Sequence, residues 1–272
     1  HFTTLVDVVA PKQRQTPDAA IQAVVRIRTE LPKAIQGIFR APEMTADLNA
    51  LSSPGSLCWD RGKVFVGARL TMYEGEEAWP TLQLPLLAFS VISGTDAILG
   101  GMRRQFSNEA PRNGASDWTE QDMQEVLDCL ASHCVCTGGG LGVTAEFGLS
   151  GGNASAVRGD QGTALFQMMA DQPHPEVGGG LFCLLQMPHR VTDERELRRL
   201  CLQMNALEME AADLPPHFGA WCPGRLGNNL AYVAFYPNPL HEVHGFALNA
   251  AFWAIGRAMW ADQELTRLGV KR

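Results

Sequence analysis

The segment HFGAWCPGRLGNNLAYVAFYPNPLHEVHGFALNAAFWAIGRAMWADQEL, residues 217–265, sets the architecture of this chain. Residues 218–222 are a short apolar run that ends at Pro223 and Gly224, and residues 230–236 are continuously apolar or aromatic. Apolar runs bounded by turn residues predict two β-strands, the second of them covered on both faces. Beyond Pro239 the apolar residues recur with helical spacing to about Leu265, which predicts a long amphipathic helix.

A similar order of elements occurs in the first half of the chain, between residues 56 and 102. Cys58 and Arg61 correspond to Cys222 and Arg225, and the pair Ala88-Phe89 corresponds to Ala251-Phe252 at nearly the same offset. Two matches at one offset predict a duplicated strand-strand-helix module, present once in full and once in abbreviated form. The alternative is that two unrelated units of this kind align by chance in an apolar chain.

Composition restricts the class of protein. The 272 residues are 46% hydrophobic and 19% charged, which indicates an ordered globular protein with a sizeable core. The formal net charge is −7 and the basic residues are scattered, so we expect neither nucleic acid nor an anionic membrane surface as a partner. The cysteines are odd in number and most lie in apolar runs, which favours reduced thiols and a cytoplasmic location.

The first half is expected to be an abbreviated module, α-β-β-α, over residues 1–108. Thr16 and Pro17 predict the start of a helix over residues 17–31. Residues 1–16, whose clearest feature is the apolar run 5–10, are expected to be an arm or an edge strand. Residues 63–73 predict a strand and residues 80–102 a helix. The polar, turn-rich segment 105–116 marks the domain boundary.

The second half, residues 116–272, is expected to be a complete module, α-β-β-β-α-β-β-α. Its first helix is capped by Ser116 and ended by glycines 138–140, and a second helix covers residues 193–212. Three strands are predicted between them, over residues 141–149, 163–170 and 180–187. The fold class is therefore α+β, with antiparallel sheets packed against helices.

The element order of residues 116–265, with the Phe218-Gly-Ala-Trp221 strand and the Pro-bounded entry to the last helix, resembles the bacterial type III secretion chaperone-like superfamily, which includes the YbjN-like proteins. The resemblance implies tandem chaperone-like modules in a bacterial protein. Members of that superfamily bind protein partners or pair with one another, and they share no active-site residues that could be carried over.

Three groups of residues invite a chemical interpretation. Gly140, Gly142 and Ala145 match a loose dinucleotide fingerprint, but that motif needs a strand before it and a helix after it. Gly139, Gly140 and Gly142 are the alternative anion site. Cys129, His133, Cys134 and Cys136 lie within eight residues, and His241, Glu242 and His244 approach a zincin motif with one residue missing. Buried thiols and a helix N-terminus explain both groups better than a metal does, so no metal and no cofactor is expected.

The aromatic side chains near the C-terminus indicate a binding surface. Most of them should belong to the core, yet Trp253 and Trp260 stand seven residues apart on a broadly apolar helix that needs cover from another module or subunit. We therefore expect a non-catalytic protein-binding or assembly factor that uses Trp253, Trp260, Phe252 and Phe246, with a polypeptide partner or a second copy as its ligand. The alternative is an enzyme or a protein that binds a small molecule or nucleotide through the Gly-rich loops 138–180.

Overall fold

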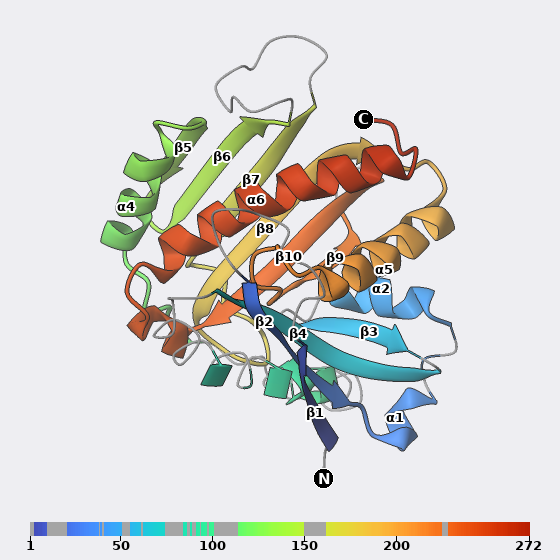
Figure 1. Cartoon of the computed structure of the whole chain (residues 1–272). Coiled ribbons are helices and arrows are strands. Elements are labelled where there is room, and N and C mark those ends of the chain that lie inside the picture. Colours follow the sequence, from blue (N-terminus) through green and yellow to red (C-terminus); the bar gives the residue numbers. More distant parts are fainter. Residues whose placement is uncertain are drawn as a thin grey trace.

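The described part of the chain forms two antiparallel sheets and the helices packed on them (Figure 1). The computed structural model describes residues 3–9, 21–37, 39, 41–50, 55–60, 62–73, 114–149, 162–224 and 228–272, and positions 84, 85, 88, 91, 92, 94–96 and 98–100. Sheet A has the order β1 (Thr3–Val9), β2 (Ile21–Glu30), β4 (Lys63–Tyr73) and β3 (Ser56–Asp60). Sheet B has the order β5 (Val135–Gly139), β6 (Gly142–Gly148), β7 (Thr163–Met169), β8 (Gly180–Arg190), β10 (Asn229–Pro237) and β9 (Ala220–Pro223). The helices are α1 (Lys33–Gln36), α2 (Glu43–Asn49), α4 (Glu120–Leu130), α5 (Glu194–Glu210), the 3-10 helix η1 (Asn238–Glu242) and α6 (Phe246–Arg267), and the described positions between 84 and 100 are also helical.

Sheet B buries one face under α6, which crosses β7 and β8, while α5 lies beside β9 and β10 (Figure 1). The period-2 pattern of β8 produces this arrangement, since Leu181, Cys183 and Leu185 are buried while Phe182 and Leu184 between them are only half-buried. On the helical side the small residues of α6, such as Ala254 and Ala258, let the helix lie close to the sheet. The hydrophobic core fills the space between sheet B and α6 and continues into sheet A through residues such as Val25, Ile27 and Leu70.

Sheet A repeats part of the topology of sheet B. The order β1-β2-β4-β3 matches β7-β8-β10-β9, and every neighbouring pair in both sets is antiparallel. Helices come at the same points, namely α1 and α2 before β3, α5 before β9, and a helical stretch after both β4 and β10. Sheet B continues past β7 with β6 and β5, and these two strands and α4 have no counterpart among the described residues of the first half.

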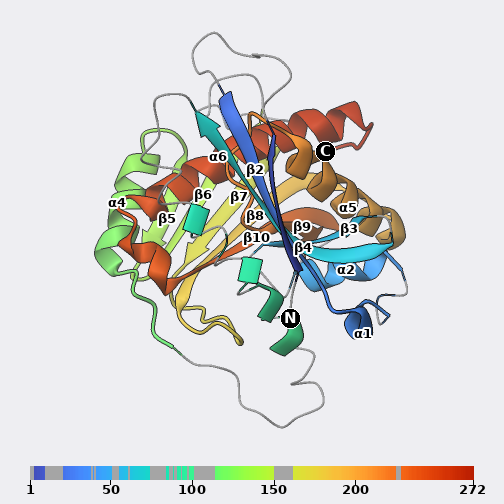
Figure 2. The same ribbon diagram turned by 60° about the horizontal axis from the view of Figure 1, so that its bottom comes forward.

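The two sheets are joined through the segment that precedes β9. Arg69 of β4 and His217 form an antiparallel bridge, with N···O distances of 3.1 and 2.8 Å. The backbone N–H of Gly55 donates to the carbonyl of Phe218 at 2.7 Å, and α2 contacts both α5 and β9. Figure 2 shows sheet A lying against α2 and the end of α5 from a second direction.

The predicted α+β class with antiparallel sheets is confirmed, and so are the long elements β4, α5, β10 and α6. The prediction of a helix over residues 17–31 is wrong, because residues 21–30 form strand β2 and the proposed cap, Thr16-Pro17, lies outside the described residues. The first half therefore reads β-β-α-α-β-β followed by helical positions, not α-β-β-α. The predicted boundary at 105–116 falls mostly on residues that are not described.

Two expectations for the second half are also wrong. An extra strand, β5, follows α4 where glycines 138–140 were expected to end the helix, so four strands separate α4 from α5. Gly140 forms the β5–β6 turn with φ of +58°, a conformation that glycine adopts without strain. The cap of α4 is Thr119 rather than Ser116, and the hydroxyl of Ser116 instead donates to the carbonyl of Gly180 at 2.9 Å.

None of the helices among the described residues is long and apolar enough to cross a membrane. All seven cysteines are free thiols. Cys183, Cys201 and Cys222 are buried, as their apolar surroundings in the sequence predict, whereas Cys129 is only partly buried.

Candidate binding cavity

The face of sheet B away from α6 carries a cavity, and three rows of side chains form its floor. Strand pairing places Met169, Phe182 and Phe235 in one row, and Gln167, Leu184 and Val233 in the next; the third row contains Gln186, Ala231 and Cys222. Directly opposed residues in antiparallel strands have their side chains on the same face, so these rows follow from the strand register alone. We call this space the sheet-B cavity.

Two loops and the end of a helix complete the walls of the sheet-B cavity, which has a volume of about 610 Å³. On one side are Ala50, which follows α2, and the turn after β9; on the other is the loop of residues 172–175. His174 holds that loop in shape, because its Nδ1 accepts the N–H groups of Glu176 at 3.1 Å and Val177 at 3.2 Å. Its ring lies 5.2 Å from that of Phe235.

The lining of the sheet-B cavity is apolar apart from amide and imidazole groups. None of its sixteen described lining residues is Asp, Glu, Lys or Arg. Three glutamines, Gln167, Gln172 and Gln186, supply donors and acceptors that match a peptide backbone or another uncharged polar group. Such a site can hold an uncharged, partly apolar ligand, whereas a phosphate or carboxylate would lose its hydration there without a cation in return.

Apart from the sheet-B cavity, a cluster of polar side chains, here called the Glu208 cluster, lies deep inside the protein where α5, α6 and the segment before β9 meet. One oxygen of Glu208 accepts from Arg257 Nε at 2.7 Å and lies 3.2 Å from His217 Nδ1, and the other accepts from Trp221 Nε1 at 2.7 Å. The guanidinium of Arg257 also donates to the carbonyl of Pro216 and stacks 4.0 Å from the centre of the Tyr232 ring. Because the carboxylate of Glu208 is fully buried, its negative charge has lost its hydration and must be compensated by these partners.

Burial and neighbouring charges shift the pKa values of this cluster. Burial alone would raise the pKa of Glu208, but the charges of Arg257 and Arg69, together with the contact with His217, outweigh it and hold the pKa below its usual 4.5. Burial lowers the pKa of His217 below 6.5 despite the nearby Glu208. Burial also lowers the pKa of Arg69 to about 10, so that Arg69 stays charged at neutral pH. The cluster therefore holds two guanidinium groups, one carboxylate and a neutral imidazole.

Ser56, His217 and Glu208 have the spacing of a nucleophile, a base and an orienting acid. The hydroxyl of Ser56 is 3.1 Å from His217 Nε2, and His217 Nδ1 is 3.2 Å from the carboxylate of Glu208. All three side chains are fully buried, and none of them lines the sheet-B cavity. A serine that substrate and water cannot reach is not a working nucleophile, so these contacts join the two sheets rather than perform catalysis.

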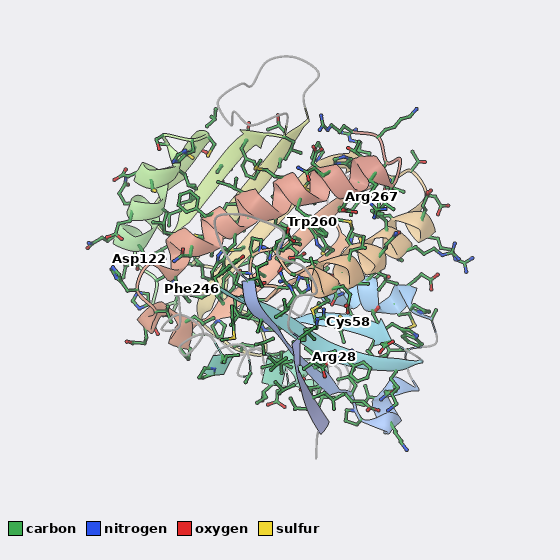
Figure 3. All side chains as sticks on the ribbon, viewed as in Figure 1. Arg28, Cys58, Asp122, Phe246, Trp260 and Arg267 are labelled. Atoms are coloured by element: carbon green, nitrogen blue, oxygen red, sulfur yellow. The ribbon has the colours of Figure 1, made fainter. Side chains whose placement is uncertain are left out.

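The predicted partner-binding residues divide into buried and exposed groups along α6. Phe246 is buried, and its ring contacts those of Tyr236 at 4.9 Å and Trp253 at 5.5 Å. Trp260 is half-buried and lies 6.5 Å from Trp221, and Figure 3 marks Phe246 and Trp260 at different points along α6. Only Phe252 is exposed, at 39%. The four residues thus do not form one surface, although Phe252 and the neighbouring Met259 are both open to solvent.

The alternative anion site does not have the geometry of a dinucleotide site. Gly139, Gly140 and Gly142 lie in the β5–β6 hairpin, so a strand follows the glycines where a helix N-terminus is required. Residues 150–161 of the proposed Gly-rich region lie outside the described residues. The fingerprint interpretation is therefore wrong for Gly140–Ala145.

The other groups with potential metal ligands are explained by local contacts. The described residues contain no group of three or more His, Cys, Asp or Glu side chains that could hold a metal ion. Cys134 and Cys136 lie on the same side of β5 with their sulfur atoms 3.3 Å apart, and burial helps raise the pKa of Cys134 to about 12. His241 contacts Asp122 of α4 at 3.3 Å.

Sequence reasoning missed both the sheet-B cavity and the Glu208 cluster. The cluster had a signal, because Arg69 interrupts an apolar strand and Arg257 falls on the apolar stripe of a helix; charges at core positions need buried partners. The cavity had a weaker signal, namely a single glutamine among the large apolar residues of each of β7 and β8. A comparison of the chain with protein-family models, curated proteins and solved structures finds no match.

Proposed function

We propose that this protein is a non-catalytic polypeptide-binding factor and that the sheet-B cavity receives an extended, uncharged segment of its partner. The observation that carries the proposal is the lining of the cavity, in which apolar side chains and three glutamines occur without a charged residue among the described positions. Apolar pockets give affinity for side chains, while amide groups can pair with the N–H and C=O groups of an extended backbone.

The architecture supports the same proposal. The matching strand order of sheets A and B is what a duplicated module would give, and tandem chaperone-like modules acting in the bacterial cytoplasm are part of this proposal. The arrangement of Ser56, His217 and Glu208, which has the spacing of a nucleophile, a base and an orienting acid, is closed to solvent. A binding role therefore fits the described residues better than an enzymatic one.

The proposal can be tested with fluorescently labelled ten-residue peptides and the intact chain. We expect uncharged peptides rich in Leu, Val and Gln to bind, and the same peptides with Glu or Asp substitutions to bind at least about tenfold more weakly. Leu184→Lys, which places an ammonium group in the middle row of the floor, should abolish binding. Circular dichroism of the variant would confirm that this half-buried position accepts lysine without unfolding.

Met259→Lys is the matched control, because Met259 is an exposed apolar residue (44%) on α6, on the other side of sheet B. It should leave peptide affinity unchanged. If Met259→Lys loses peptide binding while Leu184→Lys keeps it, the binding site lies on α6 instead. If the wild type binds none of the peptides, the proposal is wrong.

The size of the cavity supports one second candidate. A volume of about 610 Å³ lies within the range of small-molecule sites, so an uncharged, partly apolar small molecule is the alternative ligand. Native mass spectrometry of the purified protein would separate the two candidates. A small molecule that is retained by the wild type and absent from Leu184→Lys would favour this alternative. Nucleotides do not fit, because no described lining residue could neutralise a phosphate.

A further inference from the structure

Strand β1 lies at the edge of sheet A and exposes most of its apolar side chains. The exposed fractions are 43% for Leu5, 59% for Val6, 66% for Val8 and 38% for Val9. Among the described residues β1 pairs only with β2, and none of them forms a strand along its other edge. The backbone N–H and C=O groups of a sheet edge can pair with a strand of another chain. An edge strand that is apolar on both faces is a template for pairing with another strand.

The more exposed of these residues belong to the core face of sheet A. Val6 lies opposite Ile27, and Val8 lies opposite Val25; both β2 residues are buried. The hydrogen bond between the hydroxyls of Thr4 and Thr29, 3.0 Å long, shows the same side-chain alignment one pair further on. The apolar stripe of the sheet therefore continues onto β1 but is left uncovered there.

Sheet B shows how the corresponding edge is completed. Strand β7 takes the place of β1 in the shared strand order, and its core-face residues Phe166 and Met168 are fully buried. The difference is that β6 pairs antiparallel with β7 and that α4 and α6 cover this end of the sheet. Sheet B thus has an antiparallel strand, β6, beside β7, whereas the described residues of the first half provide no such strand beside β1.

The sequence of β1 suits pairing with a second copy of itself. With a twofold axis at Val6, antiparallel pairing would set Val6 against Val6, and Thr4 against Val8, on the core face. On the other face Leu5 would meet Asp7, so that no like charges are opposed, and Asp7 is already paired with Arg28 of its own chain. Such a contact uses the same surface on both copies and closes after two, whereas pairing between unlike edges would propagate into open chains.

Another edge strand, β5 of sheet B, is less suited to this contact. It ends in Gly138 and Gly139, and glycines weaken a strand and its register. Five of the seven residues of β1 are Thr or Val, which favour the extended backbone. Natural edge strands avoid association through lysine, proline or a bulge, and β1 has none of these.

We propose that two copies of this chain associate through antiparallel pairing of β1 with β1 about a twofold axis at Val6, which makes one continuous sheet of the two copies of sheet A. The contact is distinct from the sheet-B cavity, so its failure would leave the proposed binding function untouched. A single strand pair with a short flanking patch is a small interface, and the dimer should therefore be reversible and depend on protein concentration.

Sedimentation velocity from about 1 to about 200 µM tests the association of the intact chain. We expect a monomer–dimer equilibrium in the wild type and at least about tenfold weaker association in Val6→Lys, because the axis would bring the two introduced ammonium groups together. Val135→Lys is the matched control, since Val135 is an equally exposed valine (56%) on the β5 edge; it should dimerise like the wild type. A wild type that is monomeric throughout, or a dimer that only Val135→Lys disrupts, would overturn the proposal.

A charge-swapped pair tests the position of the axis and controls for misfolding. Val6→Glu alone should also be monomeric, whereas an equimolar mixture of Val6→Lys and Val6→Glu should recover dimers, because opposite charges then face each other across the axis. Only chains that remain folded and pair through residue 6 can give this recovery. Monomers in the mixture would contradict the self-pairing register.

Discussion

At Glu208 a single carboxylate ties together α5, α6 and the approach to β9. Its oxygens contact Arg257, Trp221 and His217, and all of these groups are buried. A buried ion pair contributes little net stability when both partners are present, but loss of one partner leaves an uncompensated charge in the core. The cluster therefore constrains which side chains can meet at this junction more than it stabilises the fold.

We predict that Glu208→Gln destabilises the protein by about 3–5 kcal/mol, because it leaves Arg257 charged and buried without its counterion. Guanidinium denaturation followed by tryptophan fluorescence would measure the loss. The control is Glu194→Gln at the exposed ion pair with Arg198, which should cost less than about 1 kcal/mol. Equal costs for the two variants would show that the Glu208 contacts are dispensable.

The histidines give the stability of the protein a defined dependence on pH. Burial lowers the folded-state pKa of His217 and of His189 below 6.5, so between these pKa values and 6.5 the unfolded chain binds more protons than the folded one. Stability should therefore rise with pH in this window and fall as the pH drops below about 6.5. Glu208, whose folded pKa lies below 4.5, adds a further loss as the pH falls below about 4.5.

We predict that His217→Gln flattens the decline in unfolding free energy as the pH falls below about 6.5, leaving the part due to His189. Urea denaturation at half-unit pH intervals would show this. His244→Gln, which removes an exposed imidazole after η1, is the control variant. If His217→Gln keeps the full slope, His217 is not the neutral buried group inferred from its surroundings.

At the scale of elements, long segments with one clear period were predictable and short or ambiguous ones were not. Residues 230–236 and 194–210 each contain a single pattern, and both elements formed as expected. In β2 the apolar residues fit a helical face, yet Val25, Ile27 and Thr29 also alternate with Arg26 and Arg28. The pairing with β1 and β4 settles that ambiguity, and pairing is not visible in a local window.

The start of α4 provides a test at the same scale. Thr119 accepts from the N–H of Asp122, and the carboxylate of Asp122 accepts in return from the N–H of Thr119 at 2.6 Å. We predict that Thr119→Ala costs about 1 kcal/mol of stability while Thr119→Ser, which keeps the hydroxyl, costs little. Thermal denaturation of the three proteins would compare them, and equal losses for Ala and Ser would assign the effect to packing of the methyl group instead.

At the scale of the whole molecule, a line of polar contacts makes the two sheets interdependent. The guanidinium of Arg69 in β4 donates to the carbonyls of Leu214 at 3.1 Å and Pro215 at 2.6 Å, and Thr71 donates to that of Ala212 at 2.8 Å. The residues of the Glu208 cluster come from distant parts of the sequence, and so do those that line the sheet-B cavity, which is why neither site could be located from local patterns. The charged residues of the cluster stand out in the sequence, but the sequence does not show which residues they contact.

Arg69→Leu should therefore weaken sheet A more than sheet B. The substitution removes the donor to the carbonyl of Pro215 and one of the two donors to that of Leu214, the other being the hydroxyl of Thr71 at 3.4 Å. We predict a loss of about 3 kcal/mol that appears as faster hydrogen exchange at the amides of β2 and β4. The amides of β7 and β8 should keep their protection, because their pairing and the cover from α6 do not involve Arg69. Arg26→Leu, which removes an ion pair and a 3.5 Å hydrogen bond with the exposed Glu210, should change exchange far less. If Arg69→Leu speeds exchange equally in both sheets, the chain opens as a single cooperative unit. If only sheet A responds, sheet A is a separate unit of stability that its contacts with the second half hold in place.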